Sequence, residues 1–118
     1  MASLIIFRVD EDSFIGTEVL EKFSTIGVRE VRRNSMPGAA IGGQFEVGND
    51  MVIVELKSDC KAIAVSDCSP AGYEFAVRLQ ASIKTGLRIV DESYSFDFEL
   101  NKFTNARELQ NAIESPSV

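Results

Sequence analysis

The chain of 118 residues is 45% hydrophobic and 25% charged, a composition typical of one folded domain over residues 1–118 and unlike that of a disordered segment. Its formal charge of −6 disfavours binding to nucleic acid, because the phosphate backbone requires a basic surface. No apolar run reaches the roughly 18 residues of a membrane-spanning helix, and the first residues lack a secretion signal, so we expect a cytoplasmic protein that binds no membrane.

The cysteine and histidine counts argue against a metal site and against catalysis. Cys60 and Cys68 flank residues 61–67, which are predicted to form a strand, so their α-carbons are expected about 25 Å apart, too far for a disulfide. We therefore expect two reduced thiols in a reducing compartment. The chain has no histidine, the commonest general base and metal ligand, so we expect no metal, no cofactor and no enzymatic activity.

The first part of the chain predicts a strand and a helix. Residues 4–9 are short, apolar and rich in strand-forming types, as in a buried strand. The acidic segment 10–13 offers an N-cap for a helix in which apolar residues recur at helical spacing over 15–26. Gly27 is predicted to end that helix. Residues 28–33 contain three arginines, which suits a charged edge strand.

The middle of the chain predicts β structure. Residues 34–43 hold a proline and three glycines and are predicted to form a loop. Strands are expected at 44–47 and 51–56, joined by a hairpin turn at Gly48-Asn49-Asp50. A further short strand is expected at 62–65, because its apolar residues follow another turn.

A second helix is the most clearly marked element of the chain. Ser69 supplies a capping hydroxyl and Pro70 suits the first helical position. A broad apolar face then extends to Ile83. Gly86 is predicted to end this helix, and the apolar residues 87–90 to begin a strand.

The last part of the chain predicts one more strand and a short helix. Residues 94–100 alternate between large apolar and polar side chains, which predicts a strand with Asp97 and Glu99 on its exposed face. Asn105 and Glu108 have the spacing of a capping box at the start of an amphipathic helix. The last four residues are expected to form a frayed tail.

The order of these elements, β-α-β meander-α-β-α, predicts an α+β fold. We expect a mostly antiparallel sheet of five to six strands, with the helices packed on one face. A ferredoxin-like βαββαβ core with one added hairpin is a specific version of this prediction.

Four acidic residues form the first candidate binding site. Asp97 and Glu99 are expected on one exposed face of the last strand, with Asp91 and Glu92 nearby. An acidic sheet face is suited to lysines and arginines of a partner protein, because complementary fields speed encounter and reject wrong partners. The alternative is a solvated face with no partner.

The basic cluster forms the second candidate site. Arg29, Arg32 and Arg33 stand close together in the sequence. A small anion or an acidic peptide would suit them. The alternative is an edge strand that is guarded by charge against aggregation.

Part of the chain resembles a known group of proteins. A capped helix carrying Ala-Val-Arg-Leu-Gln at 76–80 is followed by a glycine turn. Leu-Arg-Ile-Val-Asp at 87–91 and Tyr-Ser-Phe-Asp at 94–97 then follow. Together, over residues 70–100, these segments resemble small bacterial immunity proteins, the cytoplasmic inhibitors that protect cells from the toxins of contact-dependent growth inhibition systems.

The resemblance implies a function and a set of contact residues. A protein of this group neutralises a toxin domain, frequently a nuclease with a basic cleft, by covering its active site. The expected partner is therefore a basic protein domain, bound by steric and electrostatic complementarity. The candidates to meet its cations, the last two if their strands lie alongside, are Asp91, Glu92, Asp97, Glu99, Glu46 and Glu55.

Two other functions stay open on the residues alone. A small-ligand-binding regulatory domain would use the loop at 34–43 with Arg29, Arg32 and Arg33. It would show a melting temperature that rises with ligand. An oligomeric adaptor subunit would pair through an exposed strand edge and would self-associate.

Overall fold

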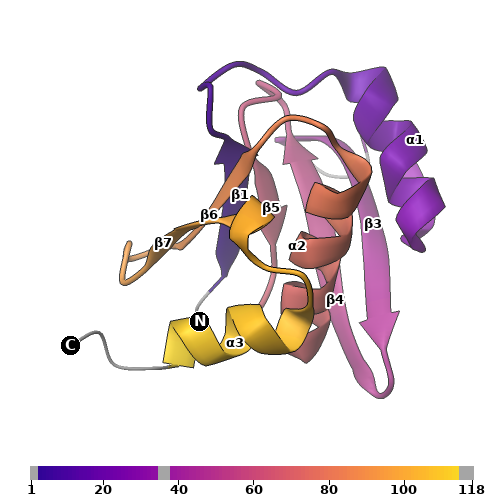
Figure 1. The fold of residues 1–118 in the computed structure, drawn as a ribbon. Coiled ribbons are helices and arrows are strands. Elements are labelled where there is room, and N and C mark those ends of the chain that lie inside the picture. The colour runs from indigo at the N-terminus through magenta and orange to yellow at the C-terminus, as the bar shows by residue number, and fades with distance from the viewer. Residues whose placement is uncertain (1–2, 35–37, 115–118) are drawn as a thin grey trace.

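The computed structural model describes residues 3–34 and 38–114, which contain seven strands and three α-helices (Figure 1). The strands and helices follow one another as β1 (Leu4–Arg8), α1 (Gly16–Ile26), β2 (Arg29–Arg33), β3 (Ala39–Val47), β4 (Asp50–Lys57), β5 (Ile63–Val65), α2 (Pro70–Ser82), β6 (Leu87–Asp91), β7 (Asp97–Glu99), the 3₁₀ turn η1 (Leu100–Lys102) and α3 (Ala106–Glu114).

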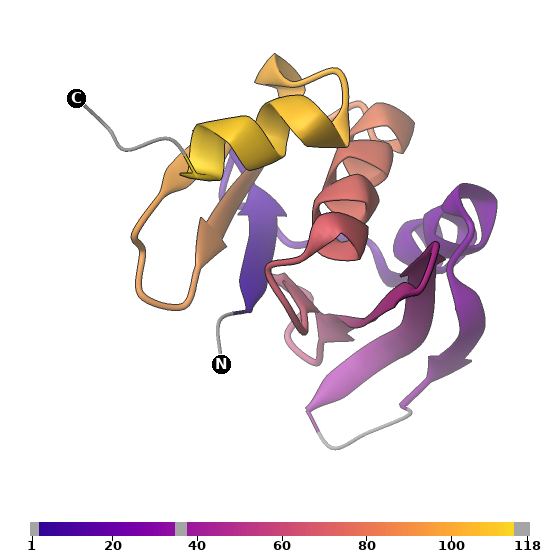
Figure 2. The ribbon, with the colours of Figure 1, turned by 90° about the horizontal axis from the view of Figure 1, so that it is seen from below.

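The strands form one sheet in the order β2-β3-β4-β5-β1-β6-β7, and every neighbouring pair is antiparallel. The three helices lie on the same side of this sheet (Figure 2). Helix α2 lies in the middle, with α1 and α3 packed against it on either side. The α+β prediction is confirmed, but the sheet has more strands than the five to six expected, and the ferredoxin-like order is not confirmed.

The largest local correction concerns residues 39–43. They were expected in a loop, but they form the first half of β3 and pair with β2 and β4. Gly43 lies so close to β2 that a β-carbon there would collide with Val28 and approach the Arg29 carbonyl oxygen at 3.1 Å. The glycine therefore serves close packing between strands instead of a loop. The rest of the predicted loop, residues 35–37, lies outside the described residues.

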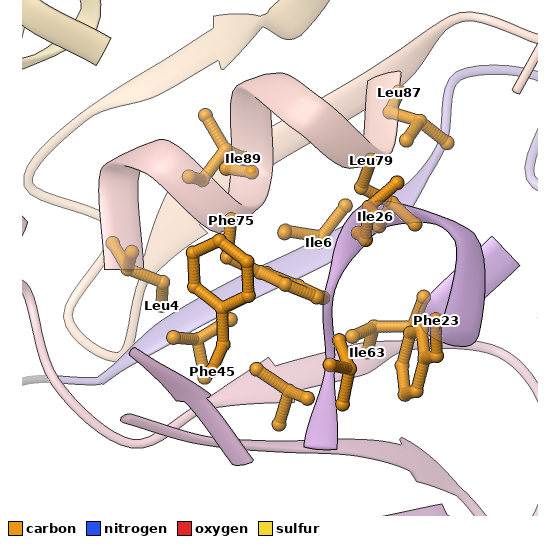
Figure 3. Close-up of a cluster of buried hydrophobic side chains, with 14 of the residues drawn as sticks. Leu4, Ile6, Phe23, Ile26, Phe45, Ile63, Phe75, Leu79, Leu87 and Ile89 are labelled. Atoms are coloured by element: carbon orange, nitrogen blue, oxygen red, sulfur yellow. The ribbon is translucent and has the colours of Figure 1, made fainter. Parts of the chain in front are cut away.

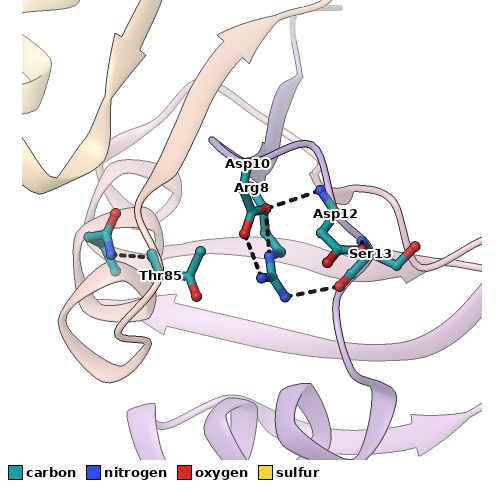
Figure 4. Close-up of polar contacts among 6 residues, drawn as sticks. Arg8, Asp10, Asp12, Ser13 and Thr85 are labelled. Carbon is teal, nitrogen blue, oxygen red and sulfur yellow. Dashed lines mark hydrogen bonds and ion pairs between the residues drawn. The ribbon is translucent and has the colours of Figure 1, made fainter.

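Helix α1 begins later than expected and without a side-chain cap. Its N-cap residue is Ile15, whose side chain makes no capping hydrogen bond, so the prediction that the acids at 10–13 cap the helix is wrong. These residues instead order the preceding loop: Asp10 binds Arg8 and accepts from the Asp12 backbone N–H at 3.0 Å (Figure 4). The helix ends as predicted at Gly27, which has a left-handed φ of 103°.

Helix α2 begins as predicted and ends earlier than predicted. The Ser69 hydroxyl accepts from the Gly72 N–H at 3.4 Å, and Pro70 is the first helical residue. The helix ends at Ser82, before Gly86. The Gln80 side chain explains the early stop, because its amide donates to the carbonyl oxygen of Thr85 and accepts from the Leu87 N–H at 2.7 Å, which fixes the turn into β6.

The segment 94–100 is not one strand. A turn separates β6 from β7, Tyr94 has a φ of 54°, and β7 covers only Asp97–Glu99 before η1. The capping of α3 is confirmed, since Asn105 Oδ1 accepts from the Glu108 N–H at 2.9 Å. The Glu108 carboxylate reaches back one residue further than a standard capping box, to the Thr104 N–H.

The core lies between α2 and the helix-facing side of the sheet (Figure 3). Phe75 of α2 stands at its centre, with Phe23 of α1 and Phe45 of β3 against its ring. The remaining labelled core side chains in Figure 3 are Leu4, Ile6, Ile26, Ile63, Leu79, Leu87 and Ile89. Within the described residues, none of the helices is sufficiently long and apolar to cross a bilayer.

Candidate functional site

The candidate site is the side of the sheet that faces away from the helices, which we call the open face. No helix in the described ranges lies on it (Figure 2). Strand register gives its composition, because residues paired across neighbouring strands share a face. One continuous row crosses all seven strands, through Arg32, Gly42, Glu55, Ala64, Ile5, Val90 and Asp97.

The middle of the open face is apolar. Ile5 and Phe7 of β1 are half-buried there. In β4, Met51 and Ile53 point to the same face by strand alternation, and Ile53 is 40% exposed. Tyr94, 67% exposed, projects from the β6–β7 turn and lines a depression together with Ile5 and Phe7. Exposed apolar residues that gather on one face are a feature of docking surfaces, so this face is the candidate site.

Asp97 and Glu99 of β7 lie at one edge of the open face, as expected, but each has a cationic neighbour. Asp97 accepts from Arg88 Nε at 3.0 Å, and the Arg88 guanidinium also lies over the Phe7 ring at 5.2 Å from its centroid. Glu99 lies 3.5 Å from the Lys102 ammonium. The charge of this edge is therefore partly balanced within the chain.

Glu46 of β3 and Glu55 of β4 also lie on the open face, because both strands belong to the same sheet as β7. They are distant from Asp97, however, because four strand spacings separate β4 from β7 and five separate β3 from β7. The separations are roughly 19 and 24 Å. Glu46 stands 3.5 Å from Arg29, whereas Glu55 is half-buried and forms no ion pair within the described residues.

Asp91 does not lie on the open face. It is only 7% exposed, ends β6 on the helix side, and accepts hydrogen bonds from the backbone and hydroxyl of Ser95. The Ser95 hydroxyl lowers the pKa of the Asp91 carboxyl, while burial opposes the shift. Its neighbour Glu92 lies in the turn and accepts from the Ser3 hydroxyl. The structure therefore does not bring the four acids of residues 91–99 together on one surface.

We expect replacement of Asp91 by asparagine to reduce stability at neutral pH more than at acid pH. A pKa lowered in the folded state means that the carboxylate stabilises the fold above its unfolded pKa of about 3.9, and that this stability is lost as pH falls through the folded pKa. Loss of the charged acceptor should cost about 1–2 kcal/mol at pH 7. Urea unfolding at pH 7 and pH 3 measures this difference.

The control for the Asp91 variant is Asp59→Asn, at an exposed turn residue that accepts only the Lys61 N–H. We expect its effect to be small and similar at both pH values. An equal loss for Asp91→Asn at pH 7 and pH 3 would show that the ionised carboxylate is not the stabilising form.

The alternative site of three arginines does not converge. Arg32 lies opposite Gly42, and Arg33 lies opposite Ile41. Because successive side chains of a strand alternate, the two arginine side chains point to opposite faces of the sheet. Arg29 lies beyond an irregularity in the strand pairing and contacts Glu46. No common anion site is formed by these side chains in the part of the chain that the structure describes.

The sheet edges offer little to a partner strand. At one end, β2 is charged and irregular in its pairing, and at the other, β7 has only three residues. Short, charged and bulged strands are the usual means by which proteins protect an edge from pairing. These features disfavour an adaptor that would assemble through its sheet edges.

The two cysteines and the acidic loop show no reactive arrangement. Both cysteines are half-buried and free, and burial raises the pKa of the Cys68 thiol, with the charge of Asp91 adding to the effect. Arg8 neutralises Asp10 and donates to the Ser13 carbonyl oxygen at 3.0 Å (Figure 4). Across residues 3–34 and 38–114, no group of three or more metal-ligating side chains is placed to hold an ion.

Sequence reasoning selected the acids and missed the apolar residues between them. Met51 and Ile53 carried no distinguishing signal, because they alternate with Val52 and Val54 in a strand whose two faces are both apolar, as in a fully buried strand. Ile5 and Phe7 carried none, since a fully buried strand shows the same pattern. Only the absence of a described helix on this side of the sheet distinguishes the two cases.

Comparison with known proteins returns no relative from which a role can be transferred. No family model, no curated protein and no solved structure matches the chain. The geometry of the open face is therefore the basis for a functional proposal.

Proposed function

We propose that this chain is a binding protein that neutralises a toxin domain by docking the open face of its sheet over the toxin's active site. The toxin is a basic protein domain, such as a nuclease with a cationic cleft, and the binding protein acts in the cytoplasm. This is the role implied by the resemblance of residues 70–100 to immunity proteins. The observation that carries it is the open face itself.

The open face has the layout of a protein-binding interface. Ile5, Phe7, Ile53 and Tyr94 supply an apolar and aromatic centre without a covering helix in the described residues. Charged residues border this centre, as polar rims border the apolar cores of known interfaces. Tyrosine is among the residues that most often contribute large shares of binding energy.

The width of the open face suits a standard-sized interface. The cross-strand row from Arg32 to Asp97 includes six strand spacings, or roughly 29 Å. A partner surface of standard size covers about 800 Å², equivalent to a square with sides of about 28 Å. Along the strands, the face measures from about 10 Å at the three-residue β7 to about 30 Å at the nine-residue β3, so its area is smaller than that square.

The net charge of −6 supports a basic partner. Opposite fields accelerate association and disfavour partners of the same sign. An inhibitor must bind before the toxin reaches its substrate, so a fast electrostatically assisted association is an advantage. We expect the association rate to fall as ionic strength rises.

The test uses Ile53→Glu, which places a charge in the apolar centre of the open face. The product of the neighbouring upstream gene is the candidate toxin. The variant and the unmodified protein are titrated calorimetrically against it, and are co-expressed with it to measure growth protection. We expect a stoichiometric complex for the unmodified protein. We expect at least tenfold weaker binding for the variant, because each 1.4 kcal/mol lost is a factor of ten in affinity.

The matched control is Ile15→Glu, since Ile15 is also an exposed isoleucine, at 58%, but precedes α1 on the helical side. It should bind within about twofold of the unmodified protein. Melting temperatures of both variants verify that each is folded. The proposal fails if no complex forms, or if the two glutamate variants bind the toxin domain equally well.

A further inference from the structure

Two hollows interrupt the open face. The first, which we call the glycine hollow, has a volume of about 190 Å³ and is formed where β3 has glycine instead of a side chain. It is lined by Gly42, Gln44, Ile53, Glu30, Glu55 and Arg32. The second, the tyrosine hollow, has a volume of about 290 Å³. It is lined by Ile5, Phe7, Arg8, Glu11, Asp12, Lys61, Ala62 and Tyr94.

Strand order gives the separation of the two hollows. The glycine hollow lies over β2, β3 and β4, and the tyrosine hollow lies over β1 and the residues that lead into β5. From β3, at the centre of the first hollow, to β5 and β1 is two to three strand spacings, which is roughly 10–14 Å. Register places Glu55, Ala64 and Ile5 in one row, and this row passes through the margin of both hollows, because Ile53 lies to one side of it and Phe7 to the other.

The carboxylates at the hollows differ from the other acids of the open face. Glu55 and Glu30 at the glycine hollow and Glu11 at the tyrosine hollow form no ion pair in the described residues, whereas Asp97, Glu99 and Glu46 each contact a cation of this chain. Of the cations that line the hollows, Arg8 is neutralised by Asp10, whereas Arg32 and Lys61 form no ion pair among the described residues. Each hollow therefore has two carboxylates without an ion pair and one such cation. The carboxylates still available to a partner therefore stand beside the two hollows.

A long cationic side chain suits this combination. Its aliphatic stem can lie against an apolar floor, Ile53 in one hollow and Ile5 with Phe7 in the other, while its charged end meets the carboxylates. The same face already holds such a group from its own chain, because the Arg88 guanidinium lies over Phe7 and binds Asp97.

We infer that the partner inserts two arginine or lysine side chains roughly 10–14 Å apart, one into each hollow. This inference rests on the proposed function, since it requires that the open face binds a protein. Residues seven or eight positions apart on one helix of the partner are separated by about 10–12 Å, so a single helix could supply both side chains.

The first test needs no partner. The ¹⁵N-labelled protein is titrated with N-acetyl-arginine methylamide and, separately, with N-acetyl-norleucine methylamide, which has an uncharged stem. We expect the arginine probe to shift the amide signals of Gly42, Ile53, Phe7 and Ala62 at least twice as far as the norleucine probe does. Equal amide shifts with both probes would overturn the inference. It would also be overturned if the amide signals in the acidic first turn of α1 shifted as far as those at the hollows.

The second test neutralises the carboxylates. Glu55→Gln combined with Glu11→Gln should weaken the toxin complex about tenfold. The control combines Glu18→Gln with Glu21→Gln, which removes two exposed charges from α1 on the helical side. The control should change the affinity less than twofold, because Glu18 and Glu21 do not contact the partner and contribute to binding only through long-range attraction.

The outcomes separate this inference from the proposed function. If the complex is weakened by Ile53→Glu but not by the Glu55 and Glu11 pair of substitutions, the open face binds the toxin and the two-cation inference is wrong. If both glutamine pairs weaken the complex equally, only net charge matters, and the inference is again wrong. If Ile53→Glu has no effect, the proposed function fails and the inference fails with it.

Discussion

Replacement of Phe75 by alanine is expected to lower the free energy of unfolding by about 3–5 kcal/mol. Phe75 is fully buried in α2, and its ring makes edge contacts with Phe23 at 5.6 Å and with Phe45 at 5.7 Å between centroids. One side chain thus joins α2 to α1 and to β3 (Figure 3). Its loss leaves a cavity that the surrounding rings cannot fill without moving two elements.

Urea unfolding of the Phe75 variant measures the expected loss, and Tyr94→Ala serves as its control. Tyr94 is also a large aromatic residue, but it is mostly exposed, so its truncation should change stability by less than about 0.5 kcal/mol. A cost for Tyr94→Ala that equals the cost for Phe75→Ala would contradict the assignment of the core to the helix-facing side of the sheet.

A glycine-to-alanine change at Gly72 is expected to destabilise the protein by about 1–3 kcal/mol. A β-carbon at this position would lie 2.5 Å from the Asp67 carbonyl oxygen and 3.2 Å from Leu4 Cδ1. The carbonyl oxygen belongs to the backbone, so relief requires α2 to move away from the sheet. The gain of up to about 1 kcal/mol in helix propensity does not offset this collision.

Gly16→Ala is the matched control for Gly72→Ala. Gly16 is also in the first turn of a helix, but nothing lies within 4 Å of an added β-carbon. We expect this change to be neutral or to raise stability by less than about 1 kcal/mol. Thermal and urea unfolding of both variants test the sign of each effect. A stabilising Gly72→Ala would mean that α2 packs less closely on β1 and β5 than the structure shows.

Element boundaries could be predicted where a local signal was strong. Ser69 with Pro70, Gly27, Gly48 with Asn49, and Asn105 each act through hydrogen bonds or dihedral angles within a few residues. Such signals do not depend on the rest of the fold. The boundary predictions were wrong where a residue contacts another element. Gly43 belongs to a strand because β2 packs against it. Helix α2 ends early because the Gln80 side chain accepts a hydrogen bond from Leu87, the first residue of β6.

The candidate site was less predictable than the fold. Asp91 and Asp97 were grouped because they are close in sequence, but the β6–β7 turn sends them to opposite sides of the sheet. Pairing of Asp97 with Val90 decides this outcome, and alternation within one segment contains no information about it. The apolar side chains of the open face could not be distinguished from core residues by sequence pattern.

The sequence by itself determined the α+β class, most helix and strand positions, the acidic charge and the absence of histidine, because these follow from composition and from contacts between near neighbours. Tertiary structure alone decided that β1 lies between β5 and β6 and that an apolar open face with two hollows results. Those features depend on which strands pair and in which register, and pairing is a property of residues far apart in the chain.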